Sequence, residues 1–266
     1  MALITTDLID GTIDKVAIAI DRIKAFEPPE GYYVAFSGGK DSVVILDLVK
    51  RAGVKFDAHY HITGIDPPEL FYFVRDVHPE VERDRPKMTI WKLIVKNMQP
   101  PTRLSRYCCG YLKESFGGDR TVITGVRWGE SVRRSKRKMT EACFRNQRRI
   151  YLHPIIDWSD NDVWNYIHQN NVAYCHLYDE GFKRLGCIGC PMSGKNRLKE
   201  FARWPKYEEK WRNAMNLAAE ARNNMPREWK DKHPQKIDWS TGDKMFDWWM
   251  NEDRSKKDPD QTVMFE

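Results

Sequence analysis

Long apolar runs are missing from this sequence of 266 residues, and no stretch approaches the roughly 20 residues that a helix needs to cross a bilayer. The beginning also lacks the basic flank and apolar block of a secretory signal, because acidic residues precede the first lysine, Lys15. Internal repeats and low-complexity segments are absent too. These absences exclude a membrane-spanning protein and a repeat fold, and we expect a cytoplasmic protein.

Cysteine is scarce as well, and four of the six cysteines form two close pairs, Cys108 with Cys109 and Cys187 with Cys190. In a cytoplasmic protein such pairs favour metal binding or catalysis over disulfides. Four thiolates suit zinc or an iron–sulfur cluster, but adjacent cysteines rarely serve one tetrahedral zinc ion together. The pattern therefore favours a [4Fe-4S] cluster, with zinc as the alternative. The two remaining cysteines stand alone and are expected to be small buried hydrophobes.

Hydrophobic residues make up 41% of the chain and charged residues 31%, as in an ordinary globular protein. Tyr32–Phe36 reads as a buried strand, Val43–Lys50 as a helix, and segments 55–62 and 121–126 as further strands with helical patterns between them. Alternation of this kind predicts an α/β fold in which a parallel sheet carries helices on both faces.

Helical spacing from Leu8 to Ile23 predicts an opening amphipathic helix, and Ser159 is the expected N-cap of a later one. The chain after Cys190 reads as mostly helical, and a charged tail after Asn251 is expected to be loosely held. We therefore predict three parts: an N-terminal helix (1–30), a nucleotide-binding domain (31–175) and a cluster-completing helical region (176–266).

Between the strand and the helix that follows it lies the run Ser37-Gly38-Gly39-Lys40-Asp41-Ser42. Glycines let the backbone come close to a ligand, while backbone N–H groups and a helix N-terminus attract an anion. The run is thus a predicted phosphate cradle, although it lacks the spacing of a Walker P-loop. A tight turn without a ligand is the alternative.

This run resembles the PP-loop of the ATP pyrophosphatases, and other motifs resemble the phosphoadenylyl-sulfate and adenylyl-sulfate (PAPS/APS) reductase family. Those motifs are Cys108-Cys109-Gly-Tyr-Leu-Lys113, Thr124-Gly125-Val126-Arg127 with Glu130, Asp66-Pro67-Pro68-Glu69, and Cys187-Ile-Gly-Cys190-Pro191. The resemblance implies a Rossmann-like (HUP-type) sheet, ATP or adenylyl sulfate as the nucleotide, and a [4Fe-4S] cluster on the paired cysteines. The residues that it implies for cofactor binding are Ser37, Gly38, Gly39, Lys40, Asp41, Ser42, Asp66, Lys113, Gly125, Arg127 and Glu130.

The chain departs from those reductases in one respect: they carry a nucleophilic cysteine near the C-terminus, and here no cysteine follows Cys190. Without that thiolate the usual thiosulfonate intermediate cannot form. The combination is similar to sulfur-insertion relatives such as the C protein of bacterial DNA phosphorothioation systems. That likeness implies catalytic roles for Lys40 and Arg127 toward phosphate charge and for Asp41 toward Mg²⁺. It also implies a sulfur donor such as a cysteine desulfurase, or a reductant, as partner.

Positive charge gathers between Arg133 and Arg149, although the formal net charge of the chain is only +6. Such a segment attracts a nucleic-acid backbone or is a solvated basic loop. Three interpretations of the function stay open: nucleotidyl or sulfur transfer, a reductase whose nucleophile has moved to Cys143 or Cys175, and a non-catalytic nucleotide- and redox-sensing regulator. We also expect a homo-oligomer and no membrane partner.

Overall fold

The structure is a computed structural model that describes residues 4–7, 11–114, 117–144, 146–234 and 237–251. The chain divides into two compact units, each assembled from separate stretches of sequence. The first unit draws on residues 1–61, 68–84 and 115–186, and the second on residues 62–67, 85–114 and 187–266. Arg145 and the predicted tail after Asn251 lie outside the described residues.

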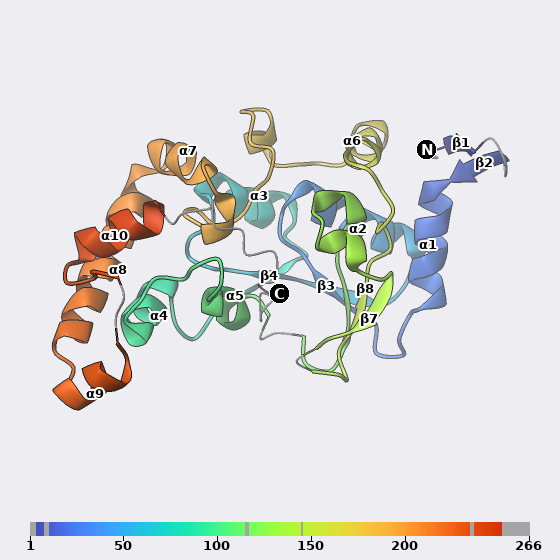
Figure 1. The fold of residues 1–266 in the computed structure, drawn as a ribbon. Coiled ribbons are helices and arrows are strands. Elements are labelled where there is room, and N and C mark those ends of the chain that lie inside the picture. Colours follow the sequence, from blue (N-terminus) through green and yellow to red (C-terminus); the bar gives the residue numbers. More distant parts are fainter. Residues whose placement is uncertain (1–3, 8–10, 115–116, 145, 235–236, 252–266) are drawn as a thin grey trace. The chain divides into compact units, whose positions relative to one another are not determined.

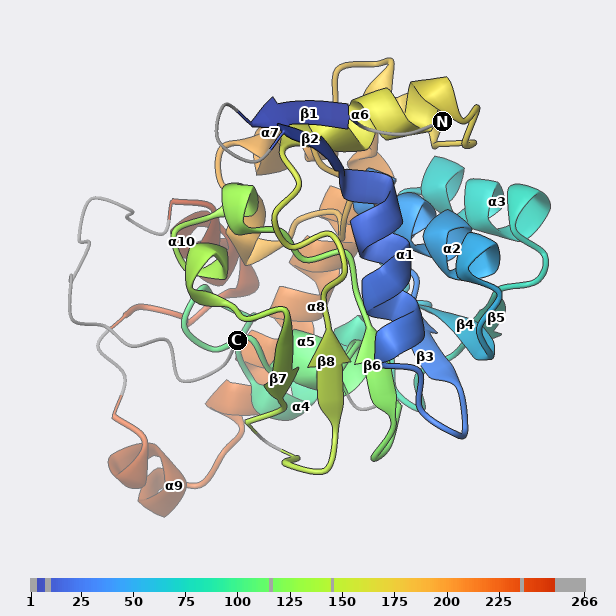
Figure 2. The same ribbon diagram turned by 90° about the vertical axis from the view of Figure 1, so that its right-hand side faces the viewer.

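The first unit is built on a six-stranded sheet in the order β5-β4-β3-β6-β8-β7. Figure 2 shows this order from β7 at the left edge to β5 at the right. The strands are β3 (Tyr32–Ala35), β4 (Phe56–His61), β5 (Glu82–Asp84), β6 (Thr121–Ile123), β7 (Thr140–Ala142) and β8 (Ile150–Leu152). All neighbours pair in parallel except β7, which pairs antiparallel with β8. The predicted α/β fold is confirmed, with one antiparallel edge strand that the sequence did not indicate.

Helices and 3₁₀ turns accompany these strands in the first unit. They are α1 (Lys15–Ala25), α2 (Lys40–Ala52), α3 (Pro68–Val77), α6 (Asp160–Gln169), η1 (Trp128–Glu130), η2 (Arg134–Lys136) and η3 (His176–Tyr178). Helix α2 packs on both α1 and α6. It is buried along most of its length, and Gly53 ends it in the left-handed conformation. Strand β3 is likewise apolar and buried, as expected for an interior strand of a parallel sheet.

The N-terminal segment differs from its prediction. Strands β1 (Ile4–Asp7) and β2 (Gly11–Asp14) pair antiparallel, and helix α1 begins only at Lys15. The Asp14 carboxylate accepts hydrogen bonds from the N–H groups of Val16 and Ala17, so it caps the helix there. The helix predicted from Leu8 was therefore wrong at its start, and Leu8 itself lies outside the described residues.

The second unit is mostly helical, as predicted for the chain after Cys190. Its elements are α4 (Ile90–Asn97), α5 (Tyr107–Leu112), η4 (Pro191–Ser193), α7 (Asn196–Arg203), α8 (Pro205–Asn223), α9 (Arg227–Lys232) and α10 (Gly242–Met250). Helix α8 packs on α4 and α10, and Figure 1 shows the green α4 beside the orange α8. Trp211 stacks on Trp249 with ring centroids 4.7 Å apart, and both indoles are fully buried. No helix in the described ranges combines the length and apolar character needed to cross a bilayer.

Candidate active site

The predicted phosphate cradle lies, as the sequence indicated, between β3 and α2. Gly38 adopts a φ of +73°, and a Cβ atom there would lie 2.7 Å from Leu70 Cδ1 and 2.9 Å from Val74 Cγ2. Gly39 is the N-cap of α2, and no side chain caps that end of the helix. Glycine is therefore required at position 38, and a helix that begins directly after such a turn favours an anion at its N-terminus.

Internal hydrogen bonds shape this turn. Ser37 Oγ donates to Ser42 Oγ over 3.2 Å, and Ser42 Oγ donates to the Gly39 carbonyl over 2.8 Å. The hydroxyl of Tyr178 accepts from the Lys40 N–H at 2.9 Å, so η3 contacts the first turn of α2. Burial raises the pKa of Tyr178, which keeps that hydroxyl protonated and available as a donor.

Gly125 follows β6 and permits a close approach of two backbones. A Cβ atom at this position would lie 2.9 Å from both the carbonyl carbon and the carbonyl oxygen of Asp41. Since backbone atoms cannot move aside as a flexible side chain would, only glycine fits. The predicted site residue Gly125 thus brings the end of β6 against the start of α2.

An ionic network joins the catalytic residues that the sequence predicted. Arg127 is only 2% exposed, and its Nε donates to Asp41 Oδ1 over 2.6 Å. One of its terminal nitrogens donates to Asp160 Oδ1 over 3.0 Å. The Lys40 ammonium lies 3.0 Å from Asp160 Oδ1 and 3.3 Å from Asp41 Oδ2. Two cations and two carboxylates therefore meet beside the glycine turn.

The network shifts the pKa values of Asp160 and Arg127. Burial by itself raises the pKa of Asp160, but the hydrogen bonds and charges of Lys40 and Arg127 outweigh it and hold that pKa below its ordinary value. Burial by itself lowers the pKa of Arg127, but the nearby carboxylates, that of Asp41 first, outweigh it and raise that pKa. Asp160 and Arg127 are thus both ionised at neutral pH. The carboxylate of Glu130, another predicted site residue, accepts from the Arg127 N–H at 2.9 Å and fixes the backbone there.

Asp160 is a member of the network that sequence reasoning missed. It is the first residue of α6, directly after the N-cap Ser159. An aspartate at that position is common because the helix dipole favours negative charge there. The sequence signal was its place directly after Ser159, the expected N-cap, which does not separate a helix-capping aspartate from a functional one.

The four paired cysteines lie together in the second unit. Their side chains line one pocket with Lys113, Thr63 and a wall of apolar residues that includes Trp211. Cys108 and Cys109 are in the first turn of α5, and Cys187 and Cys190 flank a turn in which Gly189 has a φ of +76°. A Cβ atom at Gly189 would lie 2.6 Å from Trp211 Nε1, so glycine lets this turn pack on the indole.

Charges within this pocket are strongly coupled. The Cys108 thiol donates to Cys109, which lowers the pKa of Cys109 to about 5 and raises that of Cys108. Burial raises the pKa of Cys187 to about 12, although the Lys113 ammonium opposes this effect. The negative charge of Cys187, when that thiol is ionised, in turn raises the pKa of Lys113. Lys113 thus supplies positive charge next to sulfur.

Asp66 is placed by the structure in this second unit, with its Oδ2 accepting from the Thr63 N–H at 2.9 Å. Its charge also contributes to the raised pKa of Lys113. The structure therefore associates Asp66 with the cysteine pocket, and the PP-loop residues belong to the first unit.

The two lone cysteines differ from each other. Cys175 is fully buried, as expected, and burial raises the pKa of its thiol. Cys143 is only half-buried, so the prediction of a buried hydrophobe is wrong there. It follows the edge strand β7, and the Tyr151 hydroxyl lies 3.9 Å from its sulfur. Neither cysteine lines the pocket of the four paired ones.

The basic segment is partly neutralised within the first unit. Arg134 pairs with Glu130, and Arg137 pairs with Glu141. Arg149 is buried, and its Nε donates to the Gly118 carbonyl over 2.9 Å. The segment therefore presents fewer exposed cations than the sequence suggests, with Arg133, Lys136, Lys138 and Arg148 as its exposed basic residues among those described.

Comparison with known proteins gives a consistent result. The family profile described as "phosphoadenosine phosphosulfate reductase domain" matches residues 31–193. An uncharacterized protein of Methanocaldococcus jannaschii is 32% identical over 203 residues, which are 71% of this chain and 42% of that protein. The adenosine 5'-phosphosulfate reductase of Oceanobacillus iheyensis is 27% identical over 169 residues, 59% of this chain and 69% of that enzyme.

A similar fold occurs in the crystal structure of a phosphoadenylyl-sulfate reductase from Candida auris, solved as a phosphate complex. It aligns with a TM-score of 0.50 at 21% identity and covers 66% of this chain and 88% of that one. The present chain spans less than half of the length of its two Methanocaldococcus jannaschii relatives, 42% and 46%.

Proposed function

Because the chain belongs to the phosphoadenosine phosphosulfate reductase family, we propose that it is an enzyme that binds ATP at the PP-loop and transfers an adenylyl group or sulfur. The observation that carries this proposal is the network of Lys40, Asp41, Arg127 and Asp160 beside a glycine turn. Such a network provides cations for phosphate and carboxylates for a metal ion at one place.

In this proposal the backbone around Gly38 and Gly39 and the N-terminus of α2 hold the phosphates. Lys40 and Arg127 stabilise the negative charge that develops on the leaving pyrophosphate. The carboxylates of Asp41 and Asp160 are hard oxygen donors and fit Mg²⁺, which when bound neutralises the triphosphate. Tyr178 holds the first turn of α2 in place through the Lys40 N–H.

The pocket of Cys108, Cys109, Cys187 and Cys190 fits a [4Fe-4S] cluster, because four thiols line one pocket that is otherwise largely apolar. Such a cluster, when bound, supplies one-electron chemistry or holds its ligating segments together. Lys113 would balance the negative charge of the thiolates. A tetrahedral zinc ion on the same four thiolates is the competing occupant.

Transfer of an adenylyl group or of sulfur is favoured over sulfate reduction because of the cysteines outside the two close pairs. Residues 191–266 contain no cysteine, and Cys175 is buried with a raised pKa. In the reaction we propose, an acceptor oxygen attacks the α-phosphorus of ATP, and the bond to pyrophosphate breaks. The outer sulfur of a persulfide on a donor protein then attacks the activated acceptor atom, and AMP leaves with the oxygen. A second thiol of the donor protein cleaves the remaining S–S bond, which leaves sulfur on the acceptor and a disulfide on the donor. Nucleic acid is the acceptor class that suits the exposed Arg133, Lys136 and Lys138.

The test is an anaerobic assay of the purified chain. With ATP and candidate nucleic acids we expect acceptor-dependent release of pyrophosphate and AMP, and with adenylyl sulfate and thioredoxin we expect no sulfite. Thioredoxin-dependent sulfite release that Cys143→Ser abolishes would instead identify a reductase with a relocated nucleophile. ATP binding without turnover on any acceptor would instead favour a non-catalytic nucleotide- and redox-sensing regulator.

A further inference from the structure

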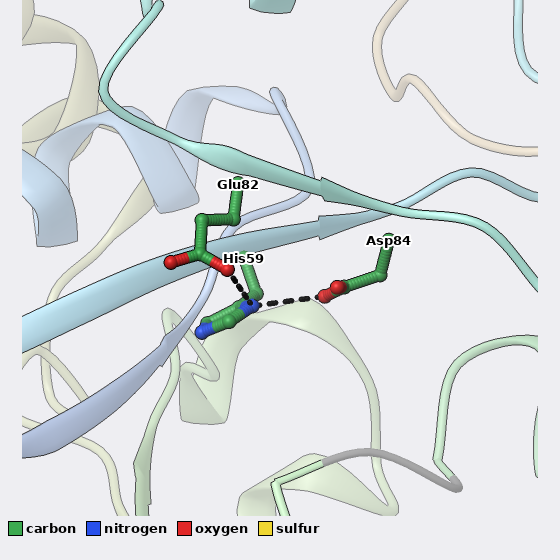
Figure 3. Close-up of side chains that lie close together, drawn as sticks. All are labelled: His59, Glu82 and Asp84. Atoms are coloured by element: carbon green, nitrogen blue, oxygen red, sulfur yellow. Dashed lines mark hydrogen bonds and ion pairs between the residues drawn. The ribbon is translucent and has the colours of Figure 1, made fainter.

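A second group of polar side chains lies on one face of the sheet, away from the PP-loop. In the parallel register of β4 and β5, His59 is opposite Glu82 and His61 is opposite Asp84. Alternate residues of a strand share a face, so these four side chains project from the same side. Figure 3 shows the Glu82 and Asp84 carboxylates converging on the same nitrogen of His59.

The distances between the donor atoms of these side chains suit binding of one metal ion. His59 Nδ1 lies 2.9 Å from Asp84 Oδ2 and 3.8 Å from Glu82 Oε2, and His61 Nδ1 lies 3.5 Å from Asp84 Oδ2. Donor atoms around tetrahedral zinc are separated by about 3.3 Å, as follows from bonds of about 2.0 Å. The donor atoms of His59, Glu82 and Asp84 all lie within 4.8 Å of one another.

The hydrogen bonds of His59 also support metal binding at this place. Its Nε2 lies 2.5 Å from Asp57 Oδ2 while its Nδ1 faces Asp84. A neutral imidazole has only one N–H, so it cannot donate to carboxylates at both nitrogens. When Nε2 donates to Asp57, the Nδ1 lone pair faces the carboxylates of Asp84 and Glu82, which is the arrangement of an imidazole that binds a metal ion.

Asp57 has the placement of a residue that orients a metal-ligating histidine. Arg120 holds both of its carboxylate oxygens, at 2.5 and 2.7 Å. The Tyr33 ring stacks on His59 at a centroid distance of 4.2 Å, and the Tyr33 hydroxyl lies 2.9 Å from His61 Nε2. Asp57 and Tyr33 thus hold the Nε2 atoms of His59 and His61, and the Nδ1 atom of each ring lies near Asp84.

The charge balance also calls for a cation. Asp57, Glu82 and Asp84 bring three carboxylates to this face, and Arg120 neutralises one of them. Carboxylates therefore outnumber the Arg120 guanidinium on this face of the sheet.

We propose that His59, Glu82 and Asp84 form a binding site for a divalent transition metal, with Zn²⁺ as its occupant and His61 beside Asp84. Imidazole nitrogen with carboxylate oxygen suits zinc, whereas Mg²⁺ and Ca²⁺ prefer oxygen ligands alone. His59 Nδ1 is a ligand, and Asp57 is the positioning residue behind it. The site fastens β5, an edge strand of three charged residues, to β4.

The test is a zinc titration by calorimetry of anaerobically purified protein after treatment with a chelator, with iron and sulfide measured on the same samples. We expect the parent to bind about one Zn²⁺ in addition to any iron. Glu82→Gln should bind zinc at least tenfold more weakly, and Asp57→Asn about tenfold or more, as for other outer-shell carboxylates. Glu82 is 67% exposed, so its substitution spares the core.

His176→Ala is the matched control, because His176 forms an exposed pair with Glu180 and is not part of the cluster. It should bind zinc as the parent does. The site is refuted by a parent protein that shows no saturable zinc binding, or by a Glu82→Gln variant that binds zinc as tightly as the parent. In either case the contacts of His59 are a structural hydrogen-bond network only.

Discussion

Arg127 donates to Asp41 over 2.6 Å from a position that is almost completely buried. The same guanidinium donates to Asp160 and to the Trp158 carbonyl. It therefore ties the first turn of α2 to the start of α6. The planar fork of an arginine can reach these three partners at once, whereas a lysine offers a single point charge.

Arg127→Lys should consequently weaken both stability and binding. The variant keeps a positive charge but loses hydrogen bonds to charged and backbone oxygens, so we expect a loss of about 2 kcal/mol in the free energy of unfolding. Affinity for ATP should fall at least tenfold, because Asp41 and Lys40 lose their fixed positions. Urea unfolding and calorimetry measure the two effects.

Arg148→Lys is the control for this substitution, because the Arg148 side chain is 83% exposed and pairs only loosely with Asp119 at 3.5 Å. It should leave stability and ATP affinity unchanged. ATP binding by Arg127→Lys at parental affinity would show that the network is structural only.

Gly38 and Gly53 allow a comparison of steric blocking with backbone strain. Both have left-handed φ values, +73° and +71°, but a Cβ atom meets Leu70 and Val74 at Gly38 and nothing within 4 Å at Gly53. Gly53→Ala should cost about 1 kcal/mol in stability through strain alone and leave ATP affinity unchanged. Gly38→Ala should lower ATP affinity at least tenfold. Equal ATP affinities of the two variants would place the phosphate site elsewhere.

The sequence predicted those parts of the site that depend on local pattern. An apolar strand, a glycine turn and a helix follow each other within Tyr32–Ala52, and the Ser159 cap lies where it was expected. It did not predict β5, because three charged residues give no hydrophobic alternation. Nor did it indicate that Arg149 is buried, since a basic run alone does not show which members find internal partners.

The cysteine pocket yields a prediction about metal content. Replacement of Cys109 or Cys187 by serine should remove most of the iron and sulfide from anaerobically purified protein, of which we expect about four each per chain. Cys143→Ser and Cys175→Ser should leave the iron content unchanged, because neither residue lines the pocket. One zinc per chain on the four thiolates with no sulfide would refute the cluster.

Asp162 gives a prediction about the pH dependence of stability. Its Oδ2 accepts from the Lys15 ammonium at 2.6 Å and from the Ser159 N–H at 2.7 Å. Burial by itself raises the pKa of Asp162, but these partners outweigh it and hold the pKa below its ordinary value. The unfolded chain therefore binds a proton here more readily than the folded one, and this stability is present above the unfolded pKa of about 3.9.

Asp162→Asn should accordingly be about 1–2 kcal/mol less stable than the parent at neutral pH, since it loses an ion pair and part of a helix cap. Because the parent loses the same contribution when Asp162 is protonated, the difference between the two proteins should shrink as the pH falls below about 4. Urea unfolding at a series of pH values measures this difference. Asp21→Asn, at an exposed position on α1, should change stability by less than about 0.5 kcal/mol throughout. A stability difference between Asp162→Asn and the parent that stays constant with pH would mean that shape, not charge, makes Asp162 stabilising.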